Sequence, residues 1–285
     1  MDNRNAAASL AAMKSDVEEE LGRLLAGGTG LHEGLRYAVL GGGKRFRPLL
    51  LLSSGEAFGG GRKTLLPFAC AIELIHCYSL VHDDLPCMDD DAVRRGKPST
   101  HKAFGEARAL LVGDGLLTLA FEIMAGAPAG AAGADRKDLS VREIAGAAGI
   151  KGMIAGQWLD IGYDEEGANT ASFLDLVSLK TGALILASIR AGALMGGAPE
   201  SIMPEMDRFG RSVGLAFQLR DDLHDAGKET EAGAGTRPNA AVLFGPDGAR
   251  TRLGGAVTEA LGALDAAGVE SAELRALALS LRVPE

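Results

Sequence analysis

Two clusters of aspartates, far apart in the chain, place the strongest constraint on its fold. The first puts five carboxylates within the nine residues from Asp83 to Asp91, directly after an apolar run. The second, Asp221 to Asp225, follows another apolar stretch of helical character. Like charges this close repel one another and raise each other's pKa, so such clusters form solvated acidic loops or bind cations. The first cluster alone favours neither the acidic loop nor the cation site. The second cluster favours a fold in which both clusters face one divalent-metal site.

The spacing within each cluster predicts how its carboxylates are directed. Asp221 and Asp225 are four residues apart, which puts them on one face of an unbroken helix. Asp83 and Asp89 are six residues apart, about 240° round an ideal helix, so a regular helix would direct them apart. Pro86 lies between them, and proline removes a backbone donor and clashes with the preceding turn. We therefore predict a break at Pro86 that brings Asp89 round toward Asp83.

The rest of the sequence predicts an all-α, single-domain fold over residues 1–285. Apolar residues make up 47% of the chain, enough for a sizeable core, and no run of alternating β-branched residues indicates a strand. Glycine and proline mark the breaks between helical segments. The expected helices cover residues 7–25, 32–40, 48–58, 65–83, 106–124, 141–160, 170–195 and 204–225, with weaker segments after 247. The Gly- and Ala-rich stretches 126–135 and 227–239 are expected to be surface loops.

Composition and charge exclude several classes of function. The net charge of −9 argues against a protein that binds nucleic acid or anionic membranes. Cys70, Cys77 and Cys87 lack paired zinc spacing and indicate a reducing, cytosolic compartment. No secretory signal pattern opens the sequence, and the best candidate span, residues 182–195, is too short for a bilayer and contains Arg190. We therefore expect a soluble cytoplasmic protein without an integral membrane segment.

A glycine-rich basic loop, residues 41–48, is the first candidate anion site. It is not the nucleotide P-loop, because Ala38 and Arg45 stand where that motif needs a glycine and a serine or threonine. Its glycines let the backbone approach an anion, and Lys44, Arg45 and Arg47 supply cationic donors next to an expected helix start. The loop is either a diphosphate-binding site or a plain basic turn.

A second basic group directly follows the first aspartate cluster. It consists of Arg94, Arg95, Lys97, His101 and Lys102. Mg²⁺ held by carboxylates keeps several waters, and a diphosphate that replaces those waters needs further positive charge on its outer oxygens. The combination suits a metal-bridged anion; the alternative is a solvated loop whose charges pair with one another.

Several polar residues interrupt apolar helical stretches. His76 lies two helical turns before Asp83, so it either shares a cavity with that carboxylate or is a satisfied core histidine. Glu73 and His76 form a Glu-x-x-His pair, but a carboxylate-bridged di-iron bundle needs a second such pair, and the sequence has none. Lys180 and Thr181 are costly in an apolar helix unless they meet an anion or a partner, which makes them candidate diphosphate ligands.

Taken in order, these segments resemble those of the trans-prenyltransferases, the isoprenyl diphosphate synthases of the polyprenyl synthetase family, and are most similar to the bacterial farnesyl diphosphate synthases. The matching segments are 42–48, 73–106, 156–157, 180–182 and 217–225. The resemblance implies a bundle of long helices around a deep apolar cavity, the isoprenoid synthase type I fold. It also implies a homodimer, with the two aspartate motifs facing each other at the mouth of each cavity.

The resemblance assigns roles to residues at matching positions. Those implied to hold Mg²⁺, three ions per site, are Asp83, Asp89 and Asp221, with Asp84, Asp222 and Asp225 in support. The implied ligands of the allylic diphosphate are Arg94, Lys180, Thr181 and Gln218. Those of isopentenyl diphosphate are Lys44, Arg47, His76 and Arg95. The implied catalytic set is Asp83, Asp84, Asp89, Arg94, Lys180 and Asp221.

The implied reaction is an electrophilic alkylation of isopentenyl diphosphate by dimethylallyl or geranyl diphosphate. Metal ions and cationic side chains stabilise the departing diphosphate, the double bond attacks the allylic cation, and a proton is lost to the released diphosphate. A closed apolar cavity keeps water away. Tyr78 and Ser79 are implied to set the floor of that cavity. An aromatic residue at position 78 is similar to the C15 synthases, so we expect farnesyl diphosphate, with geranylgeranyl diphosphate as the alternative.

The sequence departs from the family after the second cluster. The family carries a lysine-bearing loop there that closes over the diphosphate, whereas residues 226–250 look shortened and contain a single lysine, Lys228. Either Lys228 or Arg237 would have to take the place of the family's loop lysines. A second hypothesis is therefore a catalytically weak homologue that serves as a binding or regulatory subunit. A terpene cyclase is the third, although a cyclase would not need the basic loop 41–48 for a second diphosphate substrate.

Overall fold

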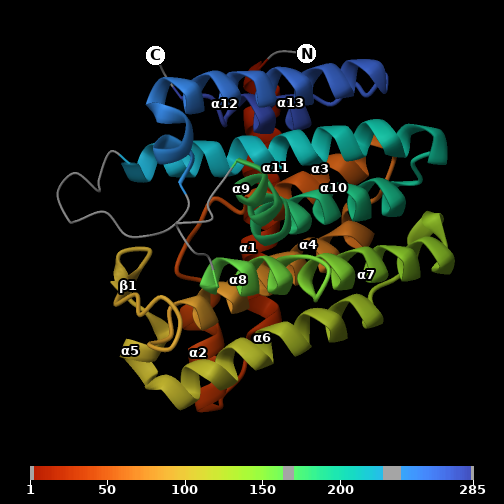
Figure 1. Cartoon of the computed structure of the whole chain (residues 1–285). Helices are drawn as coiled ribbons and strands as arrows, with labels where there is room; N and C mark the ends of the chain where they lie inside the picture. Colours follow the sequence, from red (N-terminus) through yellow and green to blue (C-terminus); the bar gives the residue numbers. More distant parts are fainter. Residues whose placement is uncertain (1–2, 163–169, 227–238, 284–285) are drawn as a thin grey trace.

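The computed structural model describes residues 3–162, 170–226 and 239–283, which form a bundle of helices (Figure 1). The helices are α1 Asn3–Leu24, α2 Gly30–Val39, α3 Phe46–Ala57, α4 Arg62–Asp83, α5 Thr100–Phe104, α6 Glu106–Gly126, α7 Ala134–Ala148, α8 Met153–Ile161, α9 Thr170–Val177, α10 Ala183–Gly196, α11 Met203–Ala226, α12 Ala240–Ala266 and α13 Ala272–Leu279. Short 3₁₀ turns are Gly130–Ala132 and Glu200–Ile202. The all-α prediction is confirmed. The predicted loop 227–239 lies outside the described residues except for its last residue.

One small β element was not predicted. Strands β1, Val93–Arg94, and β2, Lys97–Pro98, pair antiparallel between α4 and α5. The turn that joins them places Arg95 and Gly96 at positive φ. A two-residue ribbon is too short to produce an alternating pattern, so the sequence carried no signal for it.

Two of the expected helices are divided. The segment expected as one helix over 141–160 is broken at 149–152, where α7 ends and α8 begins. A Cβ at Gly152 would lie 2.1 Å from the carbonyl oxygen of Ala147, so the chain turns back too closely for any other residue. The segment expected over 170–195 passes from α9 into α10 through a π-helical turn. A single extra residue per turn leaves the apolar pattern nearly intact, which is why the sequence did not reveal it.

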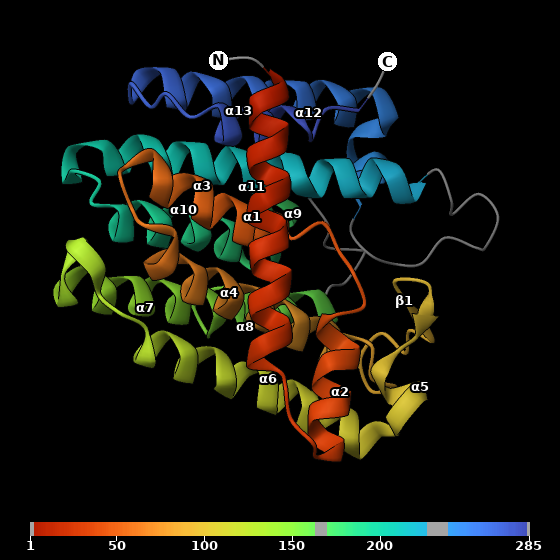
Figure 2. The same ribbon diagram turned by 180° about the vertical axis from the view of Figure 1, so that it is seen from behind.

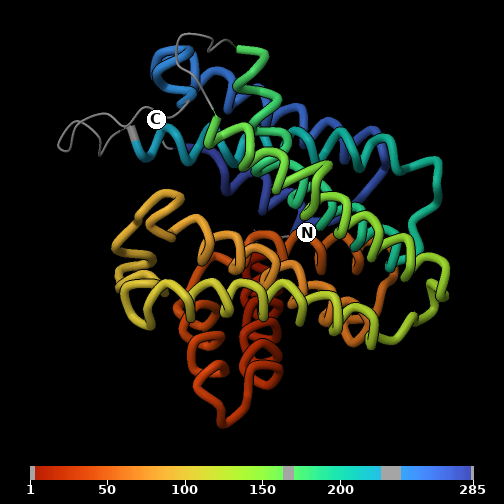
Figure 3. Tube along the Cα trace, turned by 60° about the horizontal axis from the view of Figure 1, so that its bottom comes forward, coloured from red at the N-terminus to blue at the C-terminus, as the bar shows by residue number. Residues whose placement is uncertain are grey.

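The core is packed chiefly by α3, α4, α10 and α11. Leu50, Phe68, Ile72 and Phe209 are fully buried there, and each such side chain contributes about 1.5–3 kcal/mol when it leaves water. Helix α1 runs across the other helices (Figure 2) and contacts α3, α4 and α13. Helices α4 and α6 run side by side (Figure 3), and α12 covers α11.

This arrangement places both aspartate clusters at one end of the bundle. The C-terminal end of α4, the β1–β2 ribbon and the C-terminal end of α11 lie at the same side of the protein in Figure 1. The two clusters, separated by more than a hundred residues in the sequence, therefore approach one another.

Within the described residues, three helical stretches are long and apolar enough, by length and composition, to cross a membrane: Arg62–Asp83, Glu106–Gly126 and Thr170–Gly196. The expectation of no integral membrane segment rested on a different measure. It considered uninterrupted apolar runs, whereas average composition over a helix tolerates a few charged residues. Two-thirds of the first stretch is buried inside the protein, where α4 packs against α3 and α6.

Candidate functional site

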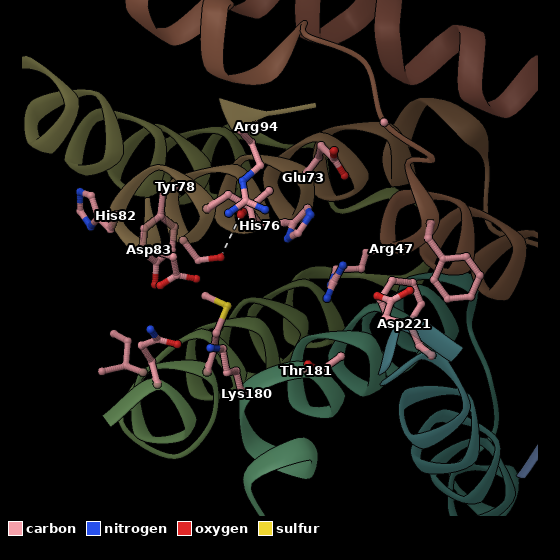
Figure 4. Close-up of a pocket in the computed structure, with 18 of the residues that line it drawn as sticks. Arg47, Glu73, His76, Tyr78, His82, Asp83, Arg94, Lys180, Thr181 and Asp221 are labelled. Atoms are coloured by element: carbon pink, nitrogen blue, oxygen red, sulfur yellow. Dashed lines mark hydrogen bonds between the residues drawn. The ribbon is translucent and has the colours of Figure 1, made fainter. Parts of the chain in front are cut away.

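A cavity of about 750 Å³ opens at the end of the bundle where the clusters meet. Its walls come from the loop before α3, the second half of α4, the β1–β2 ribbon, α8, the π turn and α11 (Figure 4). Fourteen of the residues that the sequence singled out line it: Lys44, Arg45, Arg47, Glu73, His76, Tyr78, Ser79, Asp83, Arg94, Arg95, Lys180, Thr181, Gln218 and Asp221. Asp84, Asp89 and Asp225 are not among the lining residues.

Asp83 and Asp221 enter the cavity from α4 and α11, on opposite sides of the view in Figure 4. Burial raises the pKa of Asp83 to about 6; the Lys180 ammonium works against this, and the neighbouring Asp89 adds to it. Burial likewise raises the pKa of Asp221, with Lys44 opposing. Partly buried carboxylates with raised pKa values are stabilised by a bound cation.

The donor set suits a magnesium ion that shares its shell with water. Among the residues that the structure describes, no three His, Cys, Asp or Glu side chains are grouped closely enough to hold a metal ion by themselves. Mg²⁺ requires oxygen ligands and commonly takes only one or two carboxylates, with water and phosphate oxygens completing its coordination. Asp83 and Asp221, facing one cavity that also presents many cationic side chains, fit that kind of site.

The turn after α4 has the predicted break. The helix ends at Asp83, and the backbone N–H of Asp89 donates to the carbonyl oxygen of Asp83 at 2.8 Å. The amides of Met88 and Asp90 both donate to Leu85, and Asp90 takes a positive φ of 49°. The six-residue spacing is thus closed by a loop rather than by helix, and Asp89 is returned to the vicinity of Asp83, whose pKa it raises.

Asp84 does not line the cavity. Its side chain is 2% exposed and accepts from the Arg94 guanidinium, with Nε at 3.0 Å and Nη2 at 2.5 Å from Oδ1. Arg94 also donates to Asp91 at 2.7 Å. The predicted support of a metal by Asp84 is therefore not what this geometry favours, because the carboxylate is occupied in fixing Arg94, which does line the cavity.

The second cluster also divides into different roles. Asp225 is exposed and lies 3.5 Å from His224. Asp222 is buried and accepts from the backbone N–H of Ala240 at 2.8 Å, which ties α11 to the start of α12. Its pKa is raised to about 6, chiefly by burial. Only Asp221 of this cluster lines the cavity.

A chain of hydrogen bonds fixes the hydroxyl of Thr181. Gln218 Nε2 donates to Asp222 at 2.7 Å, so its Oε1 is turned toward Thr181 and accepts from the hydroxyl at 2.7 Å. The hydroxyl proton is thereby used, and only lone pairs remain for the cavity. Thr181 is suited to face positive charge, and not to donate to a diphosphate as the sequence suggested.

The π turn, Ser178–Gly182, is held between two glycines. A Cβ at Gly156 of α8 would lie 2.3 Å from the backbone nitrogen of Lys180, and one at Gly214 of α11 would lie 2.9 Å from Cα of Gly182. π turns inside α-helices are frequent at functional sites. Here the turn brings both Lys180 and Thr181 to the cavity, where Lys180 pairs with Asp160.

The wall formed by Arg47, His76 and Arg95 is strongly cationic. Arg47 is buried with its guanidinium 5.4 Å from the centre of the Phe217 ring. Burial lowers its pKa, and Glu73 and Asp221 oppose that effect. Burial, then the charges of Arg47 and Arg95, hold the pKa of His76 well below 6.5, so the imidazole is neutral at pH 7. Nε of Arg47 and Nη1 of Arg95 have no hydrogen-bond partner in the described part of the chain. This wall is arranged to bind an anion.

Sequence reasoning missed most of the apolar wall and the importance of two polar residues. Met153, Ile154, Trp158 and Ile161 of α8 line the cavity, and their recurrence at three- and four-residue spacing was the available signal. Gln157 also lines it, with both side-chain amide atoms buried and unpaired among residues 3–162, 170–226 and 239–283. Glu73, considered only for a di-iron site, is buried against Arg45, as described below.

Tyr78 and Ser79 line the cavity one turn above Asp83. Tyr78 is 6% exposed and contacts His82 edge-on, with ring centroids 5.8 Å apart. Burial raises the pKa of Tyr78 to about 12, with Asp83 adding to the effect. An uncharged aromatic side chain therefore bounds this part of the cavity.

Comparison with known proteins gives a consistent picture. The sequence pattern of the polyprenyl synthetase family matches residues 29–235. Farnesyl diphosphate synthase of Geobacillus stearothermophilus is 46% identical over 217 residues, covering 74% of this chain and 72% of that protein. Geranylgeranyl pyrophosphate synthase 12 of Arabidopsis thaliana is 45% identical over 207 residues, covering 70% of this chain and 57% of that protein. The chain thus spans little more than half the length of the chloroplastic relatives it matches.

Solved structures extend the likeness to almost the whole chain. The FPP/GFPP synthase of Zymomonas mobilis is 36% identical with a TM-score of 0.87, covering 97% of this chain and 98% of that one. The geranyltransferase of Legionella pneumophila is 32% identical with a TM-score of 0.87, covering 98% and 97%.

Proposed function

Because the chain belongs to the polyprenyl synthetase family, we propose that it is a trans-prenyltransferase of isoprenoid biosynthesis, which joins isopentenyl diphosphate to dimethylallyl or geranyl diphosphate. The observation that carries the proposal is a single cavity with a cationic wall, two aspartates from separate helices and an apolar remainder. Two diphosphates need more positive charge than one, and the cavity offers it from both sides. The named relatives include synthases of farnesyl and of geranylgeranyl diphosphate, which leaves the product to be argued from the site.

Each wall has a proposed part in the reaction. The side chains proposed to hold isopentenyl diphosphate are Lys44, Arg47, His76 and Arg95. Those proposed to hold the departing diphosphate are Arg94 and Lys180, both restrained by ion pairs with aspartates. Asp83, Asp89 and Asp221 would hold Mg²⁺, which when bound supplies further positive charge to the leaving group. Asp84 and Asp222 fix other side chains and are proposed as structural supports.

The allylic C–O bond breaks with its electron pair leaving on the diphosphate, and the double bond of isopentenyl diphosphate attacks the resulting allylic cation. Thr181, whose lone pairs face the cavity, stabilises that positive charge. The apolar side chains of α8 and of Phe217 exclude water that would otherwise capture the cation. The attack forms a new carbon–carbon bond and a second carbocation. This carbocation loses a proton to the released diphosphate, which gives the neutral double bond of the product.

We propose farnesyl diphosphate as the product, with geranylgeranyl diphosphate as the alternative. The support is Tyr78, which lines the cavity one turn from Asp83; we propose that its ring blocks a chain longer than three isoprene units. A homodimer and a cytoplasmic location are further proposals. A terpene cyclase is less favoured, because it would leave the cationic wall without a second diphosphate.

The test is a product assay. The purified chain is incubated with Mg²⁺, radiolabelled isopentenyl diphosphate and, separately, dimethylallyl, geranyl or farnesyl diphosphate, and the dephosphorylated products are separated by chromatography. Farnesol from the first two starters supports the proposal, and geranylgeraniol supports the alternative. No turnover would favour a binding subunit, and hydrocarbon formed without isopentenyl diphosphate would favour a cyclase. Chelation by EDTA serves as the control for metal dependence.

A further inference from the structure

Arg45 is a buried cation in the middle of the basic loop. Its side chain is 1% exposed, although Lys44 and Arg47, on either side of it, line the cavity with their own cationic groups. The backbone at Arg45 has φ 52° and ψ 34°, the left-handed region, at the residue that precedes α3. A non-glycine residue is held there only when its surroundings fix it. The contacts of the guanidinium show what fixes it.

The Arg45 guanidinium joins the loop to two helices. Nη1 donates to Glu73 Oε1 of α4 at 2.6 Å, and Nη2 donates to the carbonyl oxygen of Val39, the last residue of α2, at 2.9 Å. Nε lies 3.6 Å from the carboxylate of Glu18 in α1. Arg45 is thus counted among the residues that line the cavity, yet two of its guanidinium nitrogens are engaged by hydrogen bonds to the protein.

Glu73 is the common counter-ion of two arginines. It is 2% exposed, and the oxygen that accepts from Arg45 also lies 4.0 Å from Nη2 of Arg95, which lines the cavity. The distances are unequal: Arg45 makes a hydrogen-bonded pair, whereas Arg95 is held at the limit of an ion pair. A carboxylate inside an anion-binding wall would otherwise draw its nearest cation to itself and reduce the charge offered to an anion.

We propose that Arg45 is a positioning residue for isopentenyl diphosphate: by occupying Glu73 it leaves Arg95 for the substrate, and by anchoring the loop it directs Lys44 and Arg47 into the cavity. This inference rests on the proposed function for the identity of the anion. In this role the Arg45–Glu73 pair binds neither metal nor substrate; it positions the residues that do.

The test is a double-mutant cycle of Arg45→Met and Glu73→Gln. Binding of isopentenyl diphosphate to the full chain is measured by titration calorimetry without Mg²⁺ or allylic substrate, and KM is measured for both substrates. We expect Arg45→Met to weaken isopentenyl diphosphate binding and raise its KM about tenfold or more, the effect of losing one or two charge-assisted hydrogen bonds. The KM for geranyl diphosphate should change less than about twofold, because Arg94 and Lys180 are held by other partners.

The double variant distinguishes positioning from a merely structural role. With Glu73→Gln present, no carboxylate competes for Arg95, so we expect at least about threefold of the Arg45→Met loss to be recovered. Equal increases in both KM values, or a double variant as poor as Arg45→Met, would overturn the proposal. Arg62→Met is the matched control: it removes a guanidinium that pairs with Glu56 and Asp16, and both KM values should be unchanged.

Two further results separate the possible failures. If Arg45→Met does not fold, Arg45→Lys retains the charge, and it should show the same one-sided increase in KM to a smaller degree. A wild-type chain that binds isopentenyl diphosphate but shows no turnover would refute the proposed reaction while leaving the binding test of Arg45 intact. A wild-type chain that does not bind isopentenyl diphosphate would refute both.

Discussion

Substitution of Gly156 by alanine tests whether close packing sets the geometry of the π turn. The added Cβ would lie 2.3 Å from the backbone nitrogen and 2.5 Å from Cα of Lys180, whereas ordinary contact begins near 3.4 Å. No rotamer change relieves this clash, because both atoms belong to the backbone. Helix α8 and the π turn must separate by about 1 Å, and a displacement of that size in a reacting geometry costs about a hundredfold in rate. We therefore expect Gly156→Ala to lower kcat about a hundredfold.

The same substitution has two opposing effects on the free energy of unfolding. Alanine in place of glycine favours the helix by about 1 kcal/mol, and overpacking costs about 1–3 kcal/mol. The net loss of about 1 kcal/mol is small beside the roughly 5–15 kcal/mol that stabilises a typical domain. The variant should remain folded, so that a loss of rate can be assigned to the site.

The assay is the condensation of geranyl with isopentenyl diphosphate, measured together with urea unfolding. Gly146→Ala is the matched control, since position 146 lies inside α7 and a Cβ there meets no atom within 4 Å. It should raise stability by about 0.5–1 kcal/mol and leave kcat unchanged. A wild-type kcat for Gly156→Ala, or an equal loss in Gly146→Ala, would refute the reasoning.

Three other predictions concern the cavity and its supports. Tyr78→Ala should lengthen the product beyond farnesyl diphosphate, because the side chain bounds the cavity; chromatography that shows an unchanged product would contradict this. His76 keeps a pKa well below 6.5 in the folded protein, so the unfolded chain binds a proton that the folded one does not, and stability falls by up to about 1.4 kcal/mol per pH unit below pH 6.5. Urea unfolding at pH 7 and pH 5 should show a smaller fall in His76→Asn than in the wild type, and equal falls would argue against a buried neutral imidazole. Asp222→Asn should turn the Gln218 amide over and reverse its hydrogen bond with Thr181, lowering kcat about tenfold; an unaltered kcat would exclude the hydrogen-bond chain from the mechanism.

Local patterns predicted the helices and the residues that meet at the cavity. The spacing of Asp83 and Asp89 required a break, and a loop closed by a hydrogen bond between their backbones provides it. The basic loop was identified because its glycines and cationic side chains suit an anion, and the Lys180–Thr181 pair because polar groups in an apolar helix need partners. Such signals are local: they depend on the period of a helix and on the chemistry of neighbouring residues. They do not depend on which distant segments pack against them.

The sequence by itself determined an all-α chain with two acidic clusters and a basic loop, but not which member of each cluster faces the cavity. Asp83 and Asp84 are adjacent and chemically identical, yet one lines the cavity and the other is buried against Arg94. Arg45 and Arg47 lie in the same basic segment, yet Nη1 of Arg45 is hydrogen-bonded to Glu73, whereas Nε of Arg47 has no hydrogen-bond partner in the described part of the chain. Only the tertiary structure decided these differences, because the direction of a side chain and the partner it meets depend on segments far away in the sequence.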